Sequence, residues 1–112
     1  MRAILAALAV VAGASTTPEP ATVEIRTFQF TSAALEVPVG TEVVWVNRDA
    51  IEHTVTSGVP DSADGGFVGR LSASGATFSH TFDRAGTYRY FCSRHRSMRG
   101  EIRVAPPLHG ES

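Results

Sequence analysis

The chain of 112 residues contains no lysine, and all ten of its basic residues are arginine. Basic and acidic side chains nearly balance, with a formal net charge of −1. A chain without a large basic excess lacks the electrostatic footprint of a protein that is held on nucleic acid by phosphate contacts. We therefore expect no nucleic-acid partner. The length is sufficient for one domain and not for two.

Cysteine occurs only once, at Cys92. A single cysteine excludes an internal disulfide and is too few for an iron–sulfur cluster. In an oxidising compartment, a lone thiol is a liability unless it is buried or already bonded to something.

Long apolar runs are also absent, and the one short run lies at the N-terminus. Met1 and Arg2 form a minimal positive start, "AILAALAVV" is apolar, and "AGA" at residues 12–14 has the small-residue form of a cleavage site. The run is too short to span a bilayer comfortably. We expect residues 1–14 to be a signal peptide cleaved after Ala14, so that the mature chain is periplasmic or secreted and has no membrane span. An uncleaved anchor is the alternative.

After a polar, proline-rich leader at residues 15–22, the chain shows a series of strand patterns. Alternating or β-branched apolar runs occupy residues 22–30, 34–40, 41–47, 52–57, 76–82, 87–92 and 100–105. The glycine-rich stretch between Ser57 and Gly75 holds at most one short edge strand, at residues 66–70. Seven or eight short strands without a helical period indicate an all-β fold, an antiparallel β-sandwich. We expect this domain over residues 23–105 and a tail over residues 106–112.

Three donor side chains, Cys92, His95 and Met98, follow one another at intervals of three. Such positions do not share a face of a strand, whereas a loop that curls around a centre can point all three inward. A thiolate with imidazoles and a thioether is a soft set that favours copper over zinc. Two histidines and one cysteine with a weak axial methionine form the blue-copper arrangement. Each residue alone is more often structural, but the combination favours a metal site.

The second imidazole must come from elsewhere in the chain. His53 is the candidate, because it lies between a strand that ends at Asn47 and one that begins near Thr54, where loops meet at one pole of a sandwich. His80 lies in the middle of a strand between two phenylalanines and is interpreted as structural. His109 lies in the tail and is expected to be solvated.

These motifs resemble those of a known family. The stretches "VNRDAIEHTV" and "AGTYRYFCSRHRSMRGEIRV" resemble the cupredoxins, the small blue copper proteins. The similarity is greatest to amicyanin and its plastocyanin-like relatives, because two residues separate Cys92 from His95 and two separate His95 from Met98. The resemblance covers residues 23–104.

The resemblance implies an eight-stranded Greek-key sandwich that binds one copper ion. It makes His53, Cys92 and His95 the equatorial ligands and Met98 the axial ligand. It makes Asn47 the residue that ties the two ligand loops together beside the thiolate. It also implies that His95 lies at the surface, where electrons enter or leave through the edge of its ring.

The function implied is that of a monomeric one-electron carrier between redox proteins. The donor would be a dehydrogenase or another redox protein, and the acceptor a c-type cytochrome or an oxidase. A periplasmic copper chaperone or copper-scavenging protein is the alternative. No metal position is left open for a substrate, so we expect no enzyme and no catalytic residues. The loop departs from amicyanins by carrying Arg94, Arg96 and Arg99, which either favour an acidic partner or only keep the loop soluble.

Overall fold

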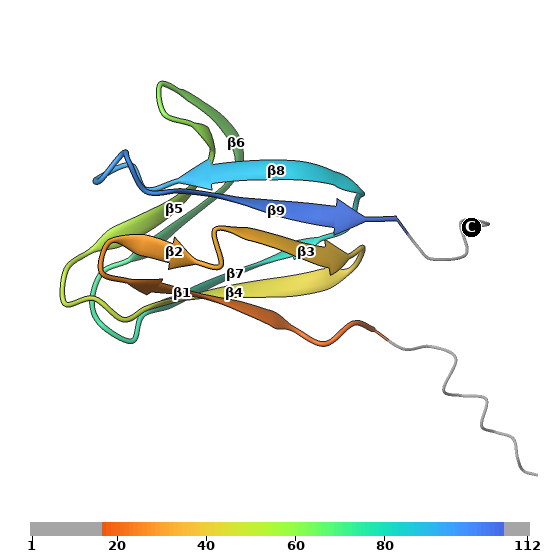
Figure 1. Cartoon of the computed structure of the whole chain (residues 1–112), viewed down its shortest axis with the longest axis horizontal. Helices are drawn as coiled ribbons and strands as arrows, with labels where there is room; N and C mark the ends of the chain where they lie inside the picture. The colour runs from red at the N-terminus through yellow and green to blue at the C-terminus, as the bar shows by residue number, and fades with distance from the viewer. Residues whose placement is uncertain (1–16, 107–112) are drawn as a thin grey trace, which may run out of the picture.

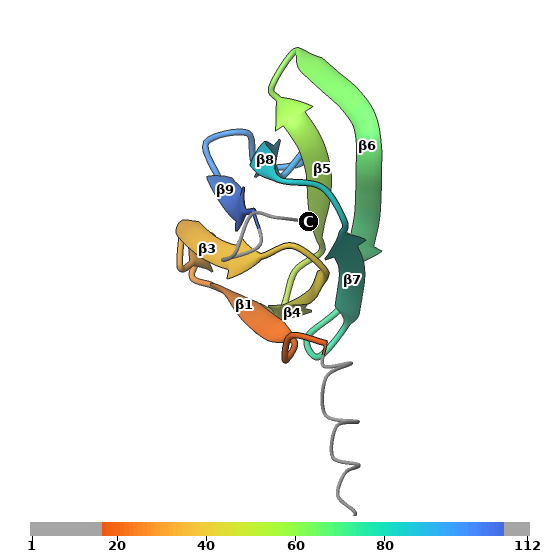
Figure 2. The same cartoon turned by 90° about the vertical axis from the view of Figure 1, so that its right-hand side faces the viewer.

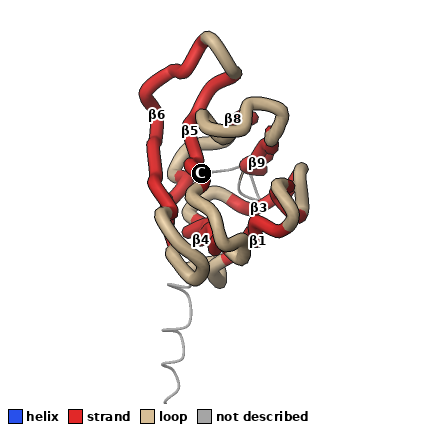
Figure 3. The backbone as a smooth tube through the Cα atoms, turned by 90° about the vertical axis from the view of Figure 1, so that its left-hand side faces the viewer, coloured by secondary structure: helices blue, strands red, loops and turns tan. Residues whose placement is uncertain are grey.

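The computed structural model describes residues 17–106, and β-strands are the only regular secondary structure among them (Figure 3). The expected signal peptide at residues 1–14 and His109 lie outside the described residues. No helix in the described part of the chain could cross a membrane. The nine strands of this part are β1 (Ala21–Arg26), β2 (Gln29–Thr31), β3 (Ala34–Pro38), β4 (Thr41–Asn47), β5 (His53–Val59), β6 (Ser62–Leu71), β7 (Thr77–Phe82), β8 (Gly86–Phe91) and β9 (Arg99–Ala105).

The strands form two sheets that pack against each other (Figures 1 and 2). One sheet has the order β2-β1-β4-β7, and the other has the order β3-β9-β8-β5-β6. Strands that follow one another in sequence often lie in different sheets, so the chain crosses repeatedly between the layers. The predicted Greek-key β-sandwich is confirmed.

Both sheets are mixed, and the prediction of an antiparallel β-sandwich is wrong for two of the strand pairs. Strand β1 runs parallel to β4, and β3 runs parallel to β9. Alternation of apolar residues tells which face of a strand is buried, but it carries no information on the direction of the neighbouring strand.

The number of strands is also larger than expected from the sequence. A turn at Thr27 and Phe28 divides the first apolar run into β1 and β2. The glycine-rich stretch forms the ten-residue edge strand β6, which pairs with β5 from Val59–Ser62 to His53–Leu71. Glycines have no side chain to alternate between faces, so this strand was underestimated.

The core lies between the two sheets and consists of the apolar residues that alternate along the strands. Trp45 in β4 is fully buried and its ring lies edge-on to that of Tyr90 in β8, with centroids 5.3 Å apart. Both residues are part of the core. Burial of such large side chains is the main stabilising contribution to a domain of this size.

Several connections meet at one end of the sandwich, on the left in Figure 1. Among them are the β1–β2 turn, the β4–β5 loop and the β8–β9 loop. All the side chains that the sequence singled out as metal ligands lie on or beside these connections.

Candidate metal centre

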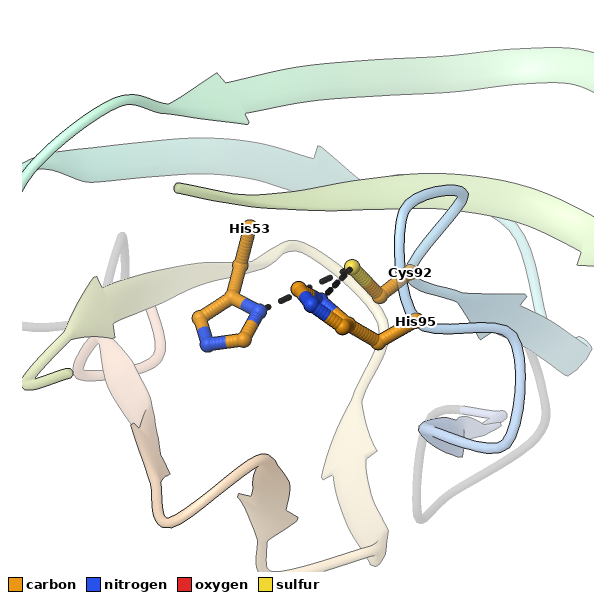
Figure 4. Close-up of side chains that lie close together, drawn as sticks. All are labelled: His53, Cys92 and His95. Carbon is orange, nitrogen blue, oxygen red and sulfur yellow. Dashed lines mark hydrogen bonds between the residues drawn. The ribbon is translucent and has the colours of Figure 1, made fainter. Parts of the chain in front are cut away.

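Three of the predicted donors converge at this end of the sandwich. His53 is the first residue of β5, Cys92 follows β8 directly, and His95 lies in the β8–β9 loop (Figure 4). The Nδ1 atom of His53 lies 3.7 Å from the Sγ atom of Cys92, and Nδ1 of His95 lies 3.9 Å from the same sulfur. All three donor atoms lie within 4.8 Å of one another.

This spacing fits one shared metal ion. With metal–nitrogen bonds of about 2.0 Å and a metal–thiolate bond of about 2.3 Å, donors about 120° apart would lie roughly 3.7 Å from each other. The two nitrogen–sulfur distances, 3.7 and 3.9 Å, are close to that value. Two imidazoles and one thiolate are the trigonal donors that copper takes in blue-copper sites. The residues present therefore fit a copper ion.

The donors differ in their exposure to solvent. His53 and Cys92 are fully buried, and Met98 is 3% exposed in the same core cluster as Cys92. His95 is only half-buried. The group is therefore shielded from water on the inner side and approaches the surface through one imidazole.

Two backbone hydrogen bonds close the loop that carries Cys92, His95 and Met98. The N–H of Met98 donates to the carbonyl of His95 at 2.9 Å, and the N–H of Cys92 donates to the carbonyl of Met98 at 3.1 Å. The loop curls back on itself as expected from the spacing of its donors. Gly100 follows in β9, where the chain re-enters the sheet.

Thr54 joins the two donor-bearing segments. Its N–H points at the Sγ atom of Cys92 at a distance of 3.4 Å, and its Oγ1 accepts the N–H of Ser93 at 2.8 Å. A hydrogen bond to the sulfur is one of the means by which a protein tunes a metal–thiolate site. Sequence reasoning missed Thr54, because a threonine in a strand is common and gives no signal of its own.

Asn47 is fully buried and holds the β4–β5 loop. Its amide donates to the carbonyls of Ile51 at 2.9 Å and Leu71 at 3.2 Å, and its Oδ1 accepts the N–H of Asp49 at 2.9 Å. These bonds fix the segment that leads into His53 against the end of β6. The role of Asn47 beside the thiolate stays a prediction.

The side of His53 that faces away from Cys92 is bound to Asp49. The Nε2 atom of the ring lies 2.9 Å from Oδ2 of Asp49. Because Nδ1 faces the sulfur, the ring proton belongs on Nε2, which then donates to the carboxylate. Ligating histidines commonly have such a carboxylate partner. This general preference of ligating histidines for a carboxylate partner could have pointed to Asp49 in the sequence.

Asp49 also accepts the backbone N–H groups of Thr27 at 2.7 Å and Phe28 at 2.9 Å. Burial would by itself raise the pKa of Asp49. The hydrogen bonds from Phe28, His53 and Thr27 favour the ionised form more strongly, so the pKa lies below its ordinary value. Asp49 is therefore a carboxylate at neutral pH.

Apolar side chains cover the donor group. The ring of Phe28 lies edge-on to both imidazoles, with centroids 5.2 Å from His53 and 4.7 Å from His95. Leu71 is fully buried opposite His53 in the β5–β6 ladder. Phe91, the last residue of β8, is also buried, whereas Ile51 in the β4–β5 loop is 40% exposed.

The arginines of the loop are largely engaged within the chain. Nη1 of Arg94 lies 3.6 Å from a carboxylate oxygen of Glu52, which also pairs with Arg70. Arg96 pairs with Asp61 at the turn of the β5–β6 hairpin, which projects beyond the sandwich in Figure 2. These ion pairs reduce the positive charge that the loop sequence by itself indicates.

His80 lies outside the donor group. It is half-buried in β7, where its ring packs on Phe67 and Phe82 with centroid distances of 4.8 Å to each. The interpretation of His80 as a structural residue is confirmed.

Comparison with known proteins places this site in a family. The family described as "Copper binding proteins, plastocyanin/azurin family" matches residues 19–105. Amicyanin of Paracoccus denitrificans is 34% identical over 82 residues, which cover 73% of this chain and 63% of that protein, less than two thirds of its length. Plastocyanin of Scenedesmus fuscus is 34% identical over 83 residues, which cover 67% of this chain and 85% of that protein.

A solved structure shows the same architecture. The novel purple cupredoxin from Nitrosopumilus maritimus aligns over 76% of this chain and 99% of its own, with a TM-score of 0.70 and 29% sequence identity. The resemblance and the copper cofactor inferred from the sequence are thereby confirmed. The chain belongs to the plastocyanin/azurin family of copper-binding proteins, the cupredoxins.

Proposed function

We propose that the chain is a one-electron carrier that holds one copper ion through His53, Cys92 and His95, with Met98 as a weak axial ligand. The observation that carries this proposal is the convergence of one thiolate and two imidazole nitrogens at the spacing of a shared ion. A bound copper ion supplies a couple between Cu(I) and Cu(II) that takes up and releases one electron. Similarity to amicyanin and plastocyanin supports the same function.

The chain's own residues keep the donors in one geometry. His53 begins a strand that is paired on both sides, with β6 and β8. Cys92 follows β8 directly, and the loop beyond it is closed by backbone hydrogen bonds. Donors held in this way move little when the charge at the site changes, which keeps the reorganisation that accompanies electron transfer small.

We propose no enzymatic activity for this site. Two imidazoles, a thiolate and a thioether form a complete donor set, whereas catalytic metal sites keep a position open for water or substrate. The buried donors His53 and Cys92 support this proposal, because a substrate could reach neither of them.

Electrons would pass through the half-buried ring of His95, beside which Phe28 is 45% exposed. The partners would be a dehydrogenase or another redox protein as donor and a c-type cytochrome or an oxidase as acceptor. Because Arg94 and Arg96 already pair with carboxylates of the chain, steering of an acidic partner would depend mostly on Arg99. Within residues 17–106, Arg99 makes no such ion pair.

We further propose that the protein is exported. Support comes from the sequence of residues 1–14 alone, which lie outside the described part of the chain. Expression of the full chain in a Gram-negative host, followed by mass spectrometry of the periplasmic fraction, tests this. A mature N-terminus at Ser15 is expected, and a full-length chain in the cytoplasm would contradict export.

The copper-loaded protein is expected to show an intense visible absorption in its oxidised state. Cys92→Ala should abolish that band, because the thiolate is removed. His80→Ala should keep it, because His80 lies outside the donor group. A colourless copper complex of the unmodified protein would refute the proposed site. Rapid copper release to a metal-free partner, together with slow electron exchange with cytochrome c, would instead favour a copper chaperone.

A further inference from the structure

The turn between β1 and β2 has an unusual backbone for its residues. Thr27 has a φ of 52° and Phe28 a φ of 60°, so both lie in the left-handed region. Neither residue is glycine, and a β-branched residue followed by a bulky aromatic residue is disfavoured there. Such conformations persist only where the surrounding structure holds them, and they are frequent at functional sites.

Asp49 is the group that holds this turn. Its Oδ1 accepts the N–H of Thr27 at 2.7 Å, and its Oδ2 accepts the N–H of Phe28 at 2.9 Å. The same Oδ2 lies 2.9 Å from Nε2 of His53. The backbone N–H of Asp49 is itself bound to the buried side chain of Asn47. One carboxylate, with 14% of its side chain exposed, thus links the turn to an imidazole of the donor group.

The β1–β2 turn positions the ring of Phe28. That ring contacts His53 and His95 edge-on, with centroid distances of 5.2 and 4.7 Å, although it is 45% exposed. An aromatic side chain that is nearly half in solvent is not fixed by burial alone. Its position over the two imidazoles therefore depends on the backbone that Asp49 holds.

We propose that Asp49 is a positioning residue for both imidazoles: it orients His53 directly and His95 through Phe28. This inference rests on the proposed copper function. A carboxylate acceptor on Nε2 fixes the tautomer of His53 and makes Nδ1 a stronger donor. A stronger donor stabilises the more highly charged, oxidised copper, so Asp49 lowers the reduction potential of the site.

The test compares Asp49→Asn with Asp49→Glu. Asparagine removes the charge and keeps an acceptor oxygen for only one of the two N–H groups of the turn, whereas glutamate keeps the charge. Asp49→Asn is expected to weaken copper binding about 10- to 100-fold, as loss of such partners does. It should also raise the reduction potential and change the electron-spin resonance spectrum of the oxidised protein. Asp49→Glu should restore part of each property.

A second variant separates this role from simple stabilisation of the turn. Thr27→Gly in the Asp49→Asn background relieves the left-handed strain, because glycine adopts this conformation freely. We expect it to recover unfolding stability while the potential, the spectrum and the copper affinity stay altered. Full recovery of these three properties would show that Asp49 is only a clamp for the turn. If Asp49→Asn alone does not fold, the double variant provides the comparison.

Wild-type potential, spectrum and affinity in Asp49→Asn would overturn the inference. Failure of the proposed function itself is distinguishable, because the unmodified protein would then form a colourless copper complex. In that case, nuclear magnetic resonance of the copper-free protein decides whether Asp49 positions His53. A slowly exchanging Nε2 proton that is lost in Asp49→Asn supports the contact, and its absence from the unmodified protein refutes it.

Discussion

At the scale of single residues, the donor group depends on side chains that are not themselves donors. Thr54 is one of them, because it contacts both segments that carry donors. It is 9% exposed, and its hydroxyl accepts the N–H of Ser93. Its backbone N–H, which points at the sulfur of Cys92, is independent of the side chain. The two contributions of this residue can therefore be separated by substitution.

We expect Thr54→Val to destabilise the copper-free protein by about 0.5–1.5 kcal/mol, the net contribution of a typical hydrogen bond, because the bond to Ser93 is only partly buried. The N–H of Ser93 loses its acceptor, whereas the N–H that points at Cys92 remains. Urea denaturation followed by circular dichroism measures the change. Thr54→Ser keeps the hydroxyl and serves as the control. Equal stability of the two variants would show that the bond to Ser93 contributes nothing.

At the scale of elements, the two sheets are joined along one side by the contact of β6 with β7. These strands belong to different sheets and are not neighbours in either ladder. The ring of Phe78 in β7 lies directly over Gly69 in β6, where an added Cβ atom would lie 2.1 Å from the ring carbon Cγ. Gly69 is thus required by a close approach of the two sheets and not by its backbone conformation.

Gly69→Ala is expected to destabilise the protein by about 1–3 kcal/mol, the usual effect of overpacking a core. The same substitution in a Phe78→Ala background should have a much smaller effect, since the ring is gone. A double-mutant cycle of thermal or urea unfolding measures the coupling between the two positions. Equal effects of Gly69→Ala in the two backgrounds would mean that the ring does not limit the approach of the sheets.

At the scale of the whole molecule, the pH dependence of unfolding depends on carboxylates that accept hydrogen bonds in the folded state. Asp64 accepts the hydroxyl of Ser57 at 2.5 Å and the N–H of Gly66 at 2.9 Å, and these bonds lower its pKa below the ordinary value of 3.8. The pKa of Glu24 is also lowered, first by its hydrogen bond from Arg26. Asp64 is exposed and Glu24 is half-buried, so solvent screens both interactions. Both groups bind protons more readily in the unfolded chain.

The copper-free protein should therefore lose stability on acidification. A carboxyl group whose pKa is lower in the folded than in the unfolded chain stabilises the fold at any pH above its unfolded pKa, which is near 4. This stabilisation is lost as the pH falls through the pKa of the folded state. Urea midpoints should be level between pH 7 and 5 and should fall toward pH 3. Asp64→Asn should reduce this fall. A urea midpoint that is unchanged from pH 5 to pH 3 in the unmodified protein would show that protonation of these carboxylates does not affect stability.

Features that depend on local spacing could be predicted from the order of the residues. Alternation along β4 placed Val43 and Trp45 in the core, because neighbouring residues of a strand point to opposite faces. The intervals between Cys92, His95 and Met98 indicated a curled loop and a soft-metal site, because a short loop brings residues together without help from the rest of the chain. The thiolate of Cys92, the imidazoles and the thioether of Met98 together favoured copper over zinc.

Features that depend on contacts between distant segments became apparent only in the folded chain. Asp49 contacts a turn more than twenty residues earlier in the chain, and the loop arginines find their carboxylates on other elements. The direction of β1 beside β4 and the length of β6 were likewise not evident, because neither leaves a periodic pattern in the sequence. Contacts between segments far apart in the chain depend on how the strands pack, so they cannot be predicted from local patterns in the sequence.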